Sequence, residues 1–126
     1  VIAGLRAGTP VDLSPCTQRR DFIGVGDVTD AWLKMARDLT RGGFDIFNIC
    51  SGEATELRAL LLAVADALGA DDRLLRFGAR PMRPGEPPVS FGANAKARRM
   101  LGWTPRALDR ALREDLIQPS KAGTPP

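Results

Sequence analysis

One short segment, residues 44–50 with the sequence Phe-Asp-Ile-Phe-Asn-Ile-Cys, constrains the fold of this chain more than any other. It is rich in β-forming residues and carries large apolar groups on both faces, which is typical of a strand covered on two sides in a parallel sheet. Only one other strand is predicted, a shorter one within residues 74–77. One or two buried strands do not make a stable parallel sheet by themselves. We therefore expect the chain to contribute an edge to a sheet that other protein completes.

Four segments repeat apolar residues at helical spacing and are predicted to be helices: residues 27–39, 57–68, 95–101 and 108–116. Asp27 and Thr55 are expected to cap the free amides at the start of the first two helices. A glycine pair at 42–43 should end the first helix, and Gly69 the second.

Three side chains are assigned to the interior of the protein. Trp32 lies on the apolar stripe of the first predicted helix, so we expect it in the core. Trp103 is expected to anchor the last helices to the rest of the domain. Cys50 ends the predicted strand, where it should behave as a small buried hydrophobe.

The order of the predicted elements indicates an α/β fold with few strands and several helices. Four prolines within residues 80–88 exclude regular helix and central strand from that stretch. Residues 119–126 are polar and rich in proline, and we expect them to form a disordered tail. Residues 1–118 are then one folded portion, as the length of 126 residues suggests.

Histidine and tyrosine are both absent from the chain. Without histidine there is no ordinary Ser-His or Cys-His nucleophile pair, and without tyrosine there is no phenol to act as acid or base. Cys16 and Cys50 are far apart and have no histidine partner, so they form no zinc-ligand pattern, and a structural disulfide is disfavoured. We assign no catalytic residue and no metal ligand to this chain.

The chain is basic, with a formal net charge of +3 and a sequence pI near 9.4. Such a balance fits nucleic acid, a membrane surface or an anionic small molecule. The arginines are scattered, and aromatic residues make up only 6% of the sequence, which disfavours nucleic acid. No run of eighteen apolar residues is present, so no membrane span is predicted. An anionic small molecule and a cytoplasmic location are the expectation.

Three segments carry a recognisable pattern. Residues 20–28 read R-D-F-I-G-V-G-D-V, residues 47–53 read F-N-I-C-S-G-E, and residues 83–88 read R-P-G-E-P-P, with L-G-W-T-P downstream at 101–105. In this order and spacing they resemble the NAD-dependent epimerase/dehydratase family, the extended short-chain dehydrogenases that act on nucleotide sugars. The family's motifs are R-D-F/Y-x-x-V-x-D-V, Y-N-I-x-S-G-E and R-P-G-D-x-P. Glu86, Cys50 and Asn94 depart from its commoner residues, and the base and sugar stay open.

The resemblance implies that the chain is the C-terminal part of a Rossmann-type fold. An N-terminal Rossmann half would carry the Gly-rich turn for NAD or NADP and the Tyr-x-x-x-Lys pair, and neither motif occurs here. The cofactor would be bound mainly by that absent part. The intact protein is expected to be a homodimer.

The same resemblance assigns roles to five residues. Arg20 and Arg83 match positions that contact the substrate diphosphate, which suits the planar guanidinium fork. Glu86 matches an acidic position that accepts hydrogen bonds from the ribose. Val11 and Leu13, with the residue between them, match a segment that lies beside the base.

Each assignment has a plainer alternative. Arg20 could be an exposed arginine or pair with Asp21, and the close neighbour Arg80 could exchange roles with Arg83. Glu86 could be a solvated loop carboxylate, and residues 11–13 a surface strand.

The resemblance implies the substrate-binding part of a nucleotide-sugar 4-epimerase, 4,6-dehydratase or 4-ketoreductase. The residues of this chain would hold the nucleotide so that the sugar faces the cofactor. The alternatives are a non-catalytic nucleotide-binding module and a truncated fragment without independent activity. The DNA immediately upstream would distinguish an enzyme from a module by the presence of the cofactor and tyrosine motifs.

Overall fold

The computed structural model describes residues 1–37 and 44–117. Its elements are the helices α1 (Ile2–Arg6), α2 (Val25–Arg37), α3 (Leu57–Ala67), α4 (Ala95–Leu101) and α5 (Leu108–Ile117), the 3-10 turn η2 (Asp72–Leu74), and the strands β1 (Val11–Leu13), β2 (Arg19–Arg20), β3 (Thr55–Glu56), β4 (Leu75–Phe77) and β5 (Val89–Ser90). This is the predicted α/β composition of few strands and several helices. The helices α3, α4 and α5 and the strand β4 lie within a residue or two of their predicted positions.

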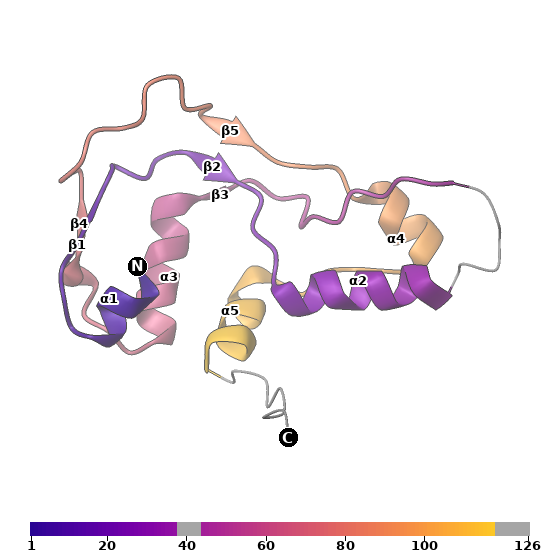
Figure 1. Cartoon of the computed structure of the whole chain (residues 1–126), viewed down its shortest axis with the longest axis horizontal. Coiled ribbons are helices and arrows are strands. Elements are labelled where there is room, and N and C mark those ends of the chain that lie inside the picture. The colour runs from indigo at the N-terminus through magenta and orange to yellow at the C-terminus, as the bar shows by residue number, and fades with distance from the viewer. Residues whose placement is uncertain (38–43, 118–126) are drawn as a thin grey trace.

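The strands form two small sheets (Figure 1). In one, β1 runs parallel to β4. In the other, β2 is central and pairs with β3 antiparallel and with β5 parallel. Two connections, residues 14–18 from β1 to β2 and residues 78–88 from β4 to β5, therefore both leave the first sheet and arrive at the second. The amide of Arg80 donates to the carbonyl of Leu13 at 3.0 Å, and that of Arg19 donates to Pro88 at 2.8 Å, so both ends of this pair of connections are tied together.

The predicted strand at residues 44–50 is absent, and that prediction is wrong for this chain. A strand exists only where a neighbouring strand satisfies its backbone groups. The segment here is held by the start of α4 instead: Lys96 pairs with Asp45 and donates to the carbonyl of Ile46 at 3.0 Å. Phe44 and Ile46 are 89% and 65% exposed. Phe47 and Ile49 of the same segment are partly buried against the cluster of Ala31, Ala97 and Trp103, so the described chain covers this segment only in part.

The interior of the described part of the chain consists of two separate clusters. The first joins α1, α3 and β4 and is built from Leu5, Cys16, Leu61, Val64, Ala65 and Leu75. The second is smaller and is built from Ala31, Ala97 and Trp103. Trp103 is fully buried and donates its indole Nε1–H to the carbonyl of Asp27 at 3.0 Å, which confirms its predicted anchoring role. Cys50 is only half-buried, and both cysteines are free thiols.

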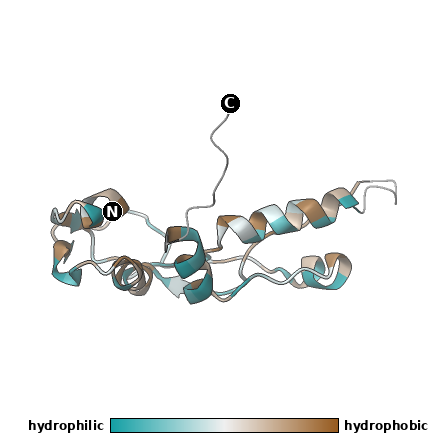
Figure 2. Cartoon of the chain, turned by 90° about the horizontal axis from the view of Figure 1, so that it is seen from below, coloured by the Kyte–Doolittle hydropathy of each residue, from teal (hydrophilic) through white to brown (hydrophobic). Residues whose placement is uncertain are grey.

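The prediction that Trp32 lies in the core is wrong, because its side chain is 67% exposed. α2 packs with α4 and α5 through the face that carries Asp27 and Ala31, which are its buried residues. Trp32 is about 100° further round the helix, beyond that contact. Seen edge-on, the described chain is flat, and apolar stretches are visible along α2 (Figure 2).

Two predicted helix caps are also wrong. α2 begins at Val25, so Asp27 lies inside its first turn, where the side chain is bonded to Arg106 and does not cap the helix. Thr55 belongs to β3, and the amides that begin α3 are bound by the β1–β2 connection: Leu57 donates to Gln18 at 2.9 Å and Arg58 to Cys16 at 2.8 Å. Backbone carbonyls of the β1–β2 connection therefore accept the hydrogen bonds that the side chain of Thr55 was expected to accept.

The predicted ends of these helices differ in outcome. Gly69 follows α3 with φ +63°, the left-handed conformation that ends a helix, as predicted. The glycine pair at 42–43 and the tail at 119–126 lie outside the described residues.

Candidate functional site

Arg20 occupies the central strand of the small three-stranded sheet. Successive side chains of a strand point to opposite faces, so Arg19 and Arg20 are directed apart. Arg19 donates from Nε and Nη2 to the carbonyl of Ala54 at 2.9 and 2.6 Å and so braces the approach to β3. Arg20 donates from Nη1 to the carbonyl of Arg19 at 2.8 Å, and its Nη2 forms an ion pair with Glu86. The strand pairing fixes the backbone from which this guanidinium projects.

Arg83 and Glu86 are the two ends of one tight turn. The amide of Glu86 donates to the carbonyl of Arg83 at 3.2 Å, and Gly85 between them has φ +74°. Proline at the second position and a left-handed glycine at the third are the pattern of a type II turn, whose end Cα atoms lie within about 7 Å of each other. Glu86 contacts Arg20, so the turn connects the backbone of Arg83 to this ion pair. We call the region made by the Arg20–Glu86 pair and the turn that begins at Arg83 the Arg20 corner.

The alternative partner for Arg20, Asp21, is engaged elsewhere. Its carboxylate accepts hydrogen bonds from the amide and hydroxyl of Ser51 at 2.7 and 2.6 Å, from the amide of Gly52 at 3.0 Å and from that of Gly92 at 3.2 Å. Partial burial works to raise the pKa of Asp21, but the bonds from Ser51, Gly52 and Gly92 outweigh it and hold the pKa below its ordinary value. Asp21 joins three chain segments at the end of β2.

Asn94 completes this junction from the other side. It is buried, and its Nδ2 donates to the carbonyls of Cys50 and Ser51 at 2.9 and 2.8 Å. Gly52 has φ +83°, and a Cβ atom there would lie 3.2 Å from that Nδ2. The side chains of Asp21 and Asn94 therefore hold the Ser-Gly-Glu turn against the rest of the molecule. The sequence analysis did not predict this role for either residue. The only sequence feature that pointed to Asp21 was its place in the Arg-Asp pair at residues 20–21.

Val11 and Leu13 lie in β1, at the opposite end of the two connections from Arg20 (Figure 1). Leu13 packs against the first core cluster. Cγ2 of Val11 lies only 2.6 Å from where a Cβ of Gly4 would be, so its side chain is directed at α1. Both side chains contribute to packing. Their predicted place beside a base stays a prediction.

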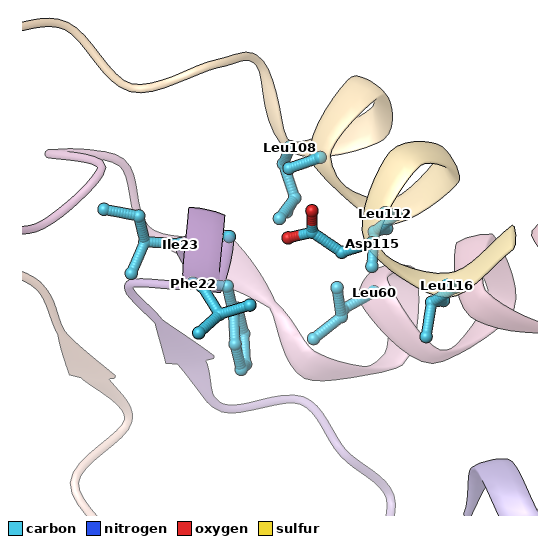
Figure 3. A pocket seen from close by; sticks show the side chains of 10 residues that line it. Phe22, Ile23, Leu60, Leu108, Leu112, Asp115 and Leu116 are labelled. Carbon is cyan, nitrogen blue, oxygen red and sulfur yellow. The ribbon is translucent and has the colours of Figure 1, made fainter. Parts of the chain in front are cut away.

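An apolar cavity of about 250 Å³ lies between the β2–α2 connection, α3 and α5 (Figure 3). Among its lining side chains are Phe22, Ile23, Leu60, Leu108, Leu112 and Leu116. Its one charged lining residue is Asp115, an anion that is paired with Arg106 at 3.2 Å. This lining offers nothing to hold a phosphate, so the cavity is distinct in chemistry from the Arg20 corner.

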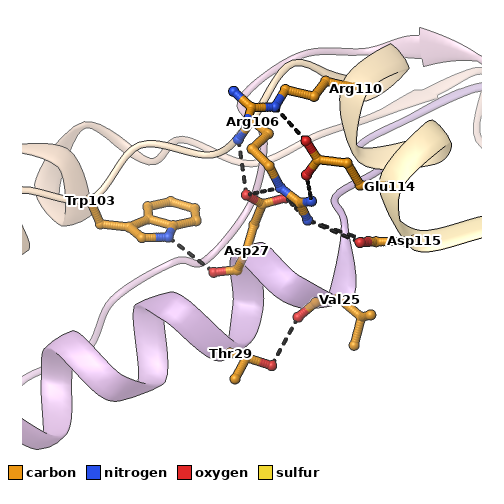
Figure 4. Close-up of polar contacts among 8 residues, drawn as sticks. All are labelled: Val25, Asp27, Thr29, Trp103, Arg106, Arg110, Glu114 and Asp115. Atoms are coloured by element: carbon orange, nitrogen blue, oxygen red, sulfur yellow. Dashed lines mark hydrogen bonds and ion pairs between the residues drawn. The ribbon is translucent and has the colours of Figure 1, made fainter. Parts of the chain in front are cut away.

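Arg106 is not one of the predicted site residues, and its donors are engaged in a network of hydrogen bonds within the protein (Figure 4). It donates to Asp27 through its amide and Nε, both at 3.0 Å, and through Nη1 to Glu114 at 2.5 Å. The hydrogen bonds that Arg106 donates to the side chains of Asp27 and then Glu114 raise the pKa of Arg106. Asp27 is only 5% exposed, so a buried carboxylate is neutralised here by an arginine of the α4–α5 connection.

Neither a metal-binding cluster nor a helix that could cross a membrane is found within residues 1–37 and 44–117. The predicted binding residues lie in two places. Arg20, Glu86 and Arg83 belong to the Arg20 corner, and Val11 and Leu13 belong to β1 in the other sheet.

Known proteins resemble this chain in sequence and in structure, although no protein-family model matches it. UDP-glucose 4-epimerase of Mycolicibacterium smegmatis is 38% identical over 87 residues, which is 69% of this chain and 26% of that protein. UDP-glucose 4-epimerase of Thermotoga maritima, solved with UDP-glucose, superposes with a TM-score of 0.74 at 26% identity, covering 89% of this chain and 35% of that one. RMD of Pseudomonas aeruginosa, solved with NADPH, gives a TM-score of 0.67 at 28% identity, covering 92% and 37%.

These matches are confined to part of each relative. The chain spans about a quarter of the length of two curated relatives that it matches. It superposes on 37% of the RMD chain and on 35% of the Thermotoga maritima epimerase chain.

Proposed function

This chain belongs to the extended short-chain dehydrogenase family of NAD-dependent nucleotide-sugar epimerases and dehydratases, and we propose that it is the part that grips the substrate. It fits a C-terminal portion of the family's Rossmann-type fold. The ligand would be a nucleoside diphosphate sugar, held by its diphosphate and nucleoside. The reaction of the intact protein would be 4-epimerisation, 4,6-dehydration or 4-keto reduction.

The observation that carries the proposal is the corner formed by Arg20, Arg83 and Glu86. Arg20 uses two of its five N–H donors within the described chain, one to Arg19 and one to Glu86. Arg83 is exposed, and its side chain forms no hydrogen bond or ion pair with residues 1–37 or 44–117. Two guanidinium groups with donors to spare, held by a strand and a tight turn, suit a diphosphate, whose oxygens accept parallel hydrogen bonds.

The cofactor role follows from the family. NAD or NADP, when bound, accepts or supplies the hydride of such reactions, and we place it mainly on protein outside this chain. The residues of this chain bind and orient the nucleotide and act on no proton of the sugar. A homodimer and a cytoplasmic location belong to the same proposal.

Calorimetric titration of the intact protein with UDP, GDP, CDP and dTDP tests the proposal. We expect at least one of them to bind, and Arg20→Ala and Arg83→Ala to weaken that binding. Arg99→Ala is the matched control, because Arg99 is an exposed arginine of α4. If none of the four binds, the proposal is wrong. Binding of a nucleoside diphosphate without conversion of any of the corresponding nucleotide sugars would favour the non-catalytic nucleotide-binding module.

A further inference from the structure

The guanidinium of Arg58, in the first turn of α3, lies over the aromatic ring of Phe77 at the end of β4. Its Cζ atom is 4.3 Å from the ring centroid. Both ends of this contact are fixed by the backbone, because the amide of Arg58 donates to the carbonyl of Cys16 at 2.8 Å and Phe77 is paired with Leu13 in β1. Phe77 also packs against the first core cluster. The ring is therefore a rigid support for the guanidinium.

The described chain gives Arg58 no other partner. Its side chain is exposed and forms no hydrogen bond or ion pair with residues 1–37 or 44–117. A guanidinium packs on an aromatic ring through its flat face. With one face on Phe77, Arg58 presents the opposite face and an uncompensated positive charge to a ligand.

Arg58 lies within reach of a ligand bound at the Arg20 corner. It follows Thr55 by three residues, and Thr55 is paired with Arg20 in the three-stranded sheet. The Cα atoms of Arg20 and Arg58 are therefore separated by at most about 16 Å. Both side chains are long, so a nucleotide with its diphosphate at Arg20 can extend its base to Arg58.

A base that reaches this region needs a flat partner. The side chains of Val11 and Leu13, which were expected beside it, are used in packing. Nucleobases stack on guanidinium planes as they do on aromatic rings. A phosphate would bind the N–H edge of an arginine instead, and Arg20 and Arg83 already offer such edges. The flat face of Arg58 thus matches the one part of the ligand that still lacks a partner.

We infer that Arg58, supported by Phe77, is the surface on which the base of the nucleotide stacks. This inference rests on the proposed function, because it presupposes that the diphosphate is bound at the Arg20 corner. The ligand class is a flat heteroaromatic base joined to a diphosphate. The contribution of Arg58 comes from its plane and not from its charge.

Two substitutions separate the plane from the charge. Arg58→Lys keeps the charge and loses the plane, whereas Arg58→Trp keeps a plane and loses the charge. Both are titrated calorimetrically, in the intact protein, with the tightest-binding nucleoside diphosphate among UDP, GDP, CDP and dTDP. We expect Arg58→Lys and Arg58→Ala to bind it about 5- to 30-fold more weakly than wild type. Arg58→Trp should stay within about threefold of wild type, because a base stacks equally well on indole.

Two controls accompany these variants. Arg73→Ala removes an exposed arginine of η2 that pairs with Asp71 at 2.8 Å, and it should leave the affinity unchanged. Inorganic diphosphate, used to displace the nucleotide, has no base. Its affinity should be the same in wild type and in all three variants of Arg58, which also shows that the Arg20 corner is intact in each.

The outcomes distinguish this inference from the proposed function. The inference requires Arg58→Trp to bind the nucleotide more tightly than Arg58→Lys, and any other order overturns it. Equal affinity of Arg58→Ala and wild type, or an equal loss for inorganic diphosphate, also overturns it and leaves the proposed function standing. If none of the four nucleotides binds the wild-type protein, the proposed function fails and the inference fails with it.

Discussion

The side chain of Asp27 and the guanidinium of Arg106 are joined by two hydrogen bonds, Nε to Oδ1 at 3.0 Å and Nη2 to Oδ2 at 3.2 Å, while the carbonyl of Asp27 accepts from Trp103. One residue of α2 therefore holds both the buried tryptophan and the connection that leads into α5. Asp27 is almost completely buried, so its charge depends on Arg106 for compensation.

Loss of that compensation should destabilise the fold. Arg106→Ala leaves the buried carboxylate of Asp27 unpaired, and we expect the free energy of unfolding to fall by about 2–4 kcal/mol. Arg113→Ala is the control, because its pair with Asp66 at 3.5 Å is exposed and should contribute less than about 1 kcal/mol. Urea denaturation followed by circular dichroism measures both. Equal stability of the two variants would show that the network is dispensable.

The hydrogen bonds to Asp21 should make stability depend on pH. Because its pKa is lowered in the folded state, the charged form is the stabilised one. The contribution is complete above the unfolded pKa of about 3.9 and is lost as the pH falls through the folded value. Asp21→Asn should cost about 1–3 kcal/mol at pH 7. The difference from wild type should shrink toward pH 3. A difference that stays constant between pH 7 and pH 3 would contradict this role.

The uncovered apolar segments should make the isolated chain marginally stable or self-associating. Phe44 is 89% exposed, Ile46 65% and Trp32 67%, and residues 44–50 have no strand partner in the described chain. Such surfaces bind other protein. Sedimentation velocity over a range of concentrations should show association, and the double change Phe44→Ser and Ile46→Ser should reduce it. Ala59→Ser, at an exposed position of α3, is the control. A sharply melting wild-type monomer at every concentration would contradict the expectation.

The isolated chain should not bind a nicotinamide cofactor usefully. It lacks the Gly-rich turn that cradles a pyrophosphate, and it contains no tyrosine. Titration with NAD and with NADP should give no measurable heat in the micromolar range. Micromolar binding of either would mean that the cofactor site lies on this part of the protein.

Local patterns predicted local structure well in this chain. The four prolines within residues 80–88 excluded regular helix and central strand, and this stretch contains a tight turn at residues 83–86. Gly69 ends α3, as predicted. Trp103 was predicted to be an aromatic anchor from its place in the Leu-Gly-Trp motif, and the structure shows that its indole also donates to the carbonyl of Asp27. Each of these depends on a few neighbouring residues.

The wrong predictions concern contacts between residues that are far apart in the sequence. Residues 44–50 carry a strand pattern, and Trp32 lies on a helical stripe, but an apolar pattern states only that cover is needed. Whether it is supplied depends on other elements. In the same way Asp27 has the chemistry of a cap and serves as the acceptor of a distant arginine.

The candidate site was predicted residue by residue and not as an arrangement. The family resemblance selected Arg20, Arg83 and Glu86, but the pairing of Arg20 with Glu86 spans 66 positions and depends on β2 and β5 lying side by side. The junction at Asp21 was missed because a lone aspartate beside an arginine suggests an ion pair.

The central claim is that Arg20 and Arg83 together bind the diphosphate. Calorimetric titration of the intact protein with its preferred nucleoside diphosphate tests it most directly, using Arg20→Ala, Arg83→Ala, the double variant and the control Arg99→Ala. Each single change should weaken binding by roughly 1.5–3 kcal/mol. The double change should cost less than the sum, because the arginines share one ligand. Arg→Lys at either position should recover only part of the loss, since lysine lacks the two-pronged geometry. Affinities of both single variants equal to those of wild type and Arg99→Ala would contradict the claim and leave the fold resemblance alone standing.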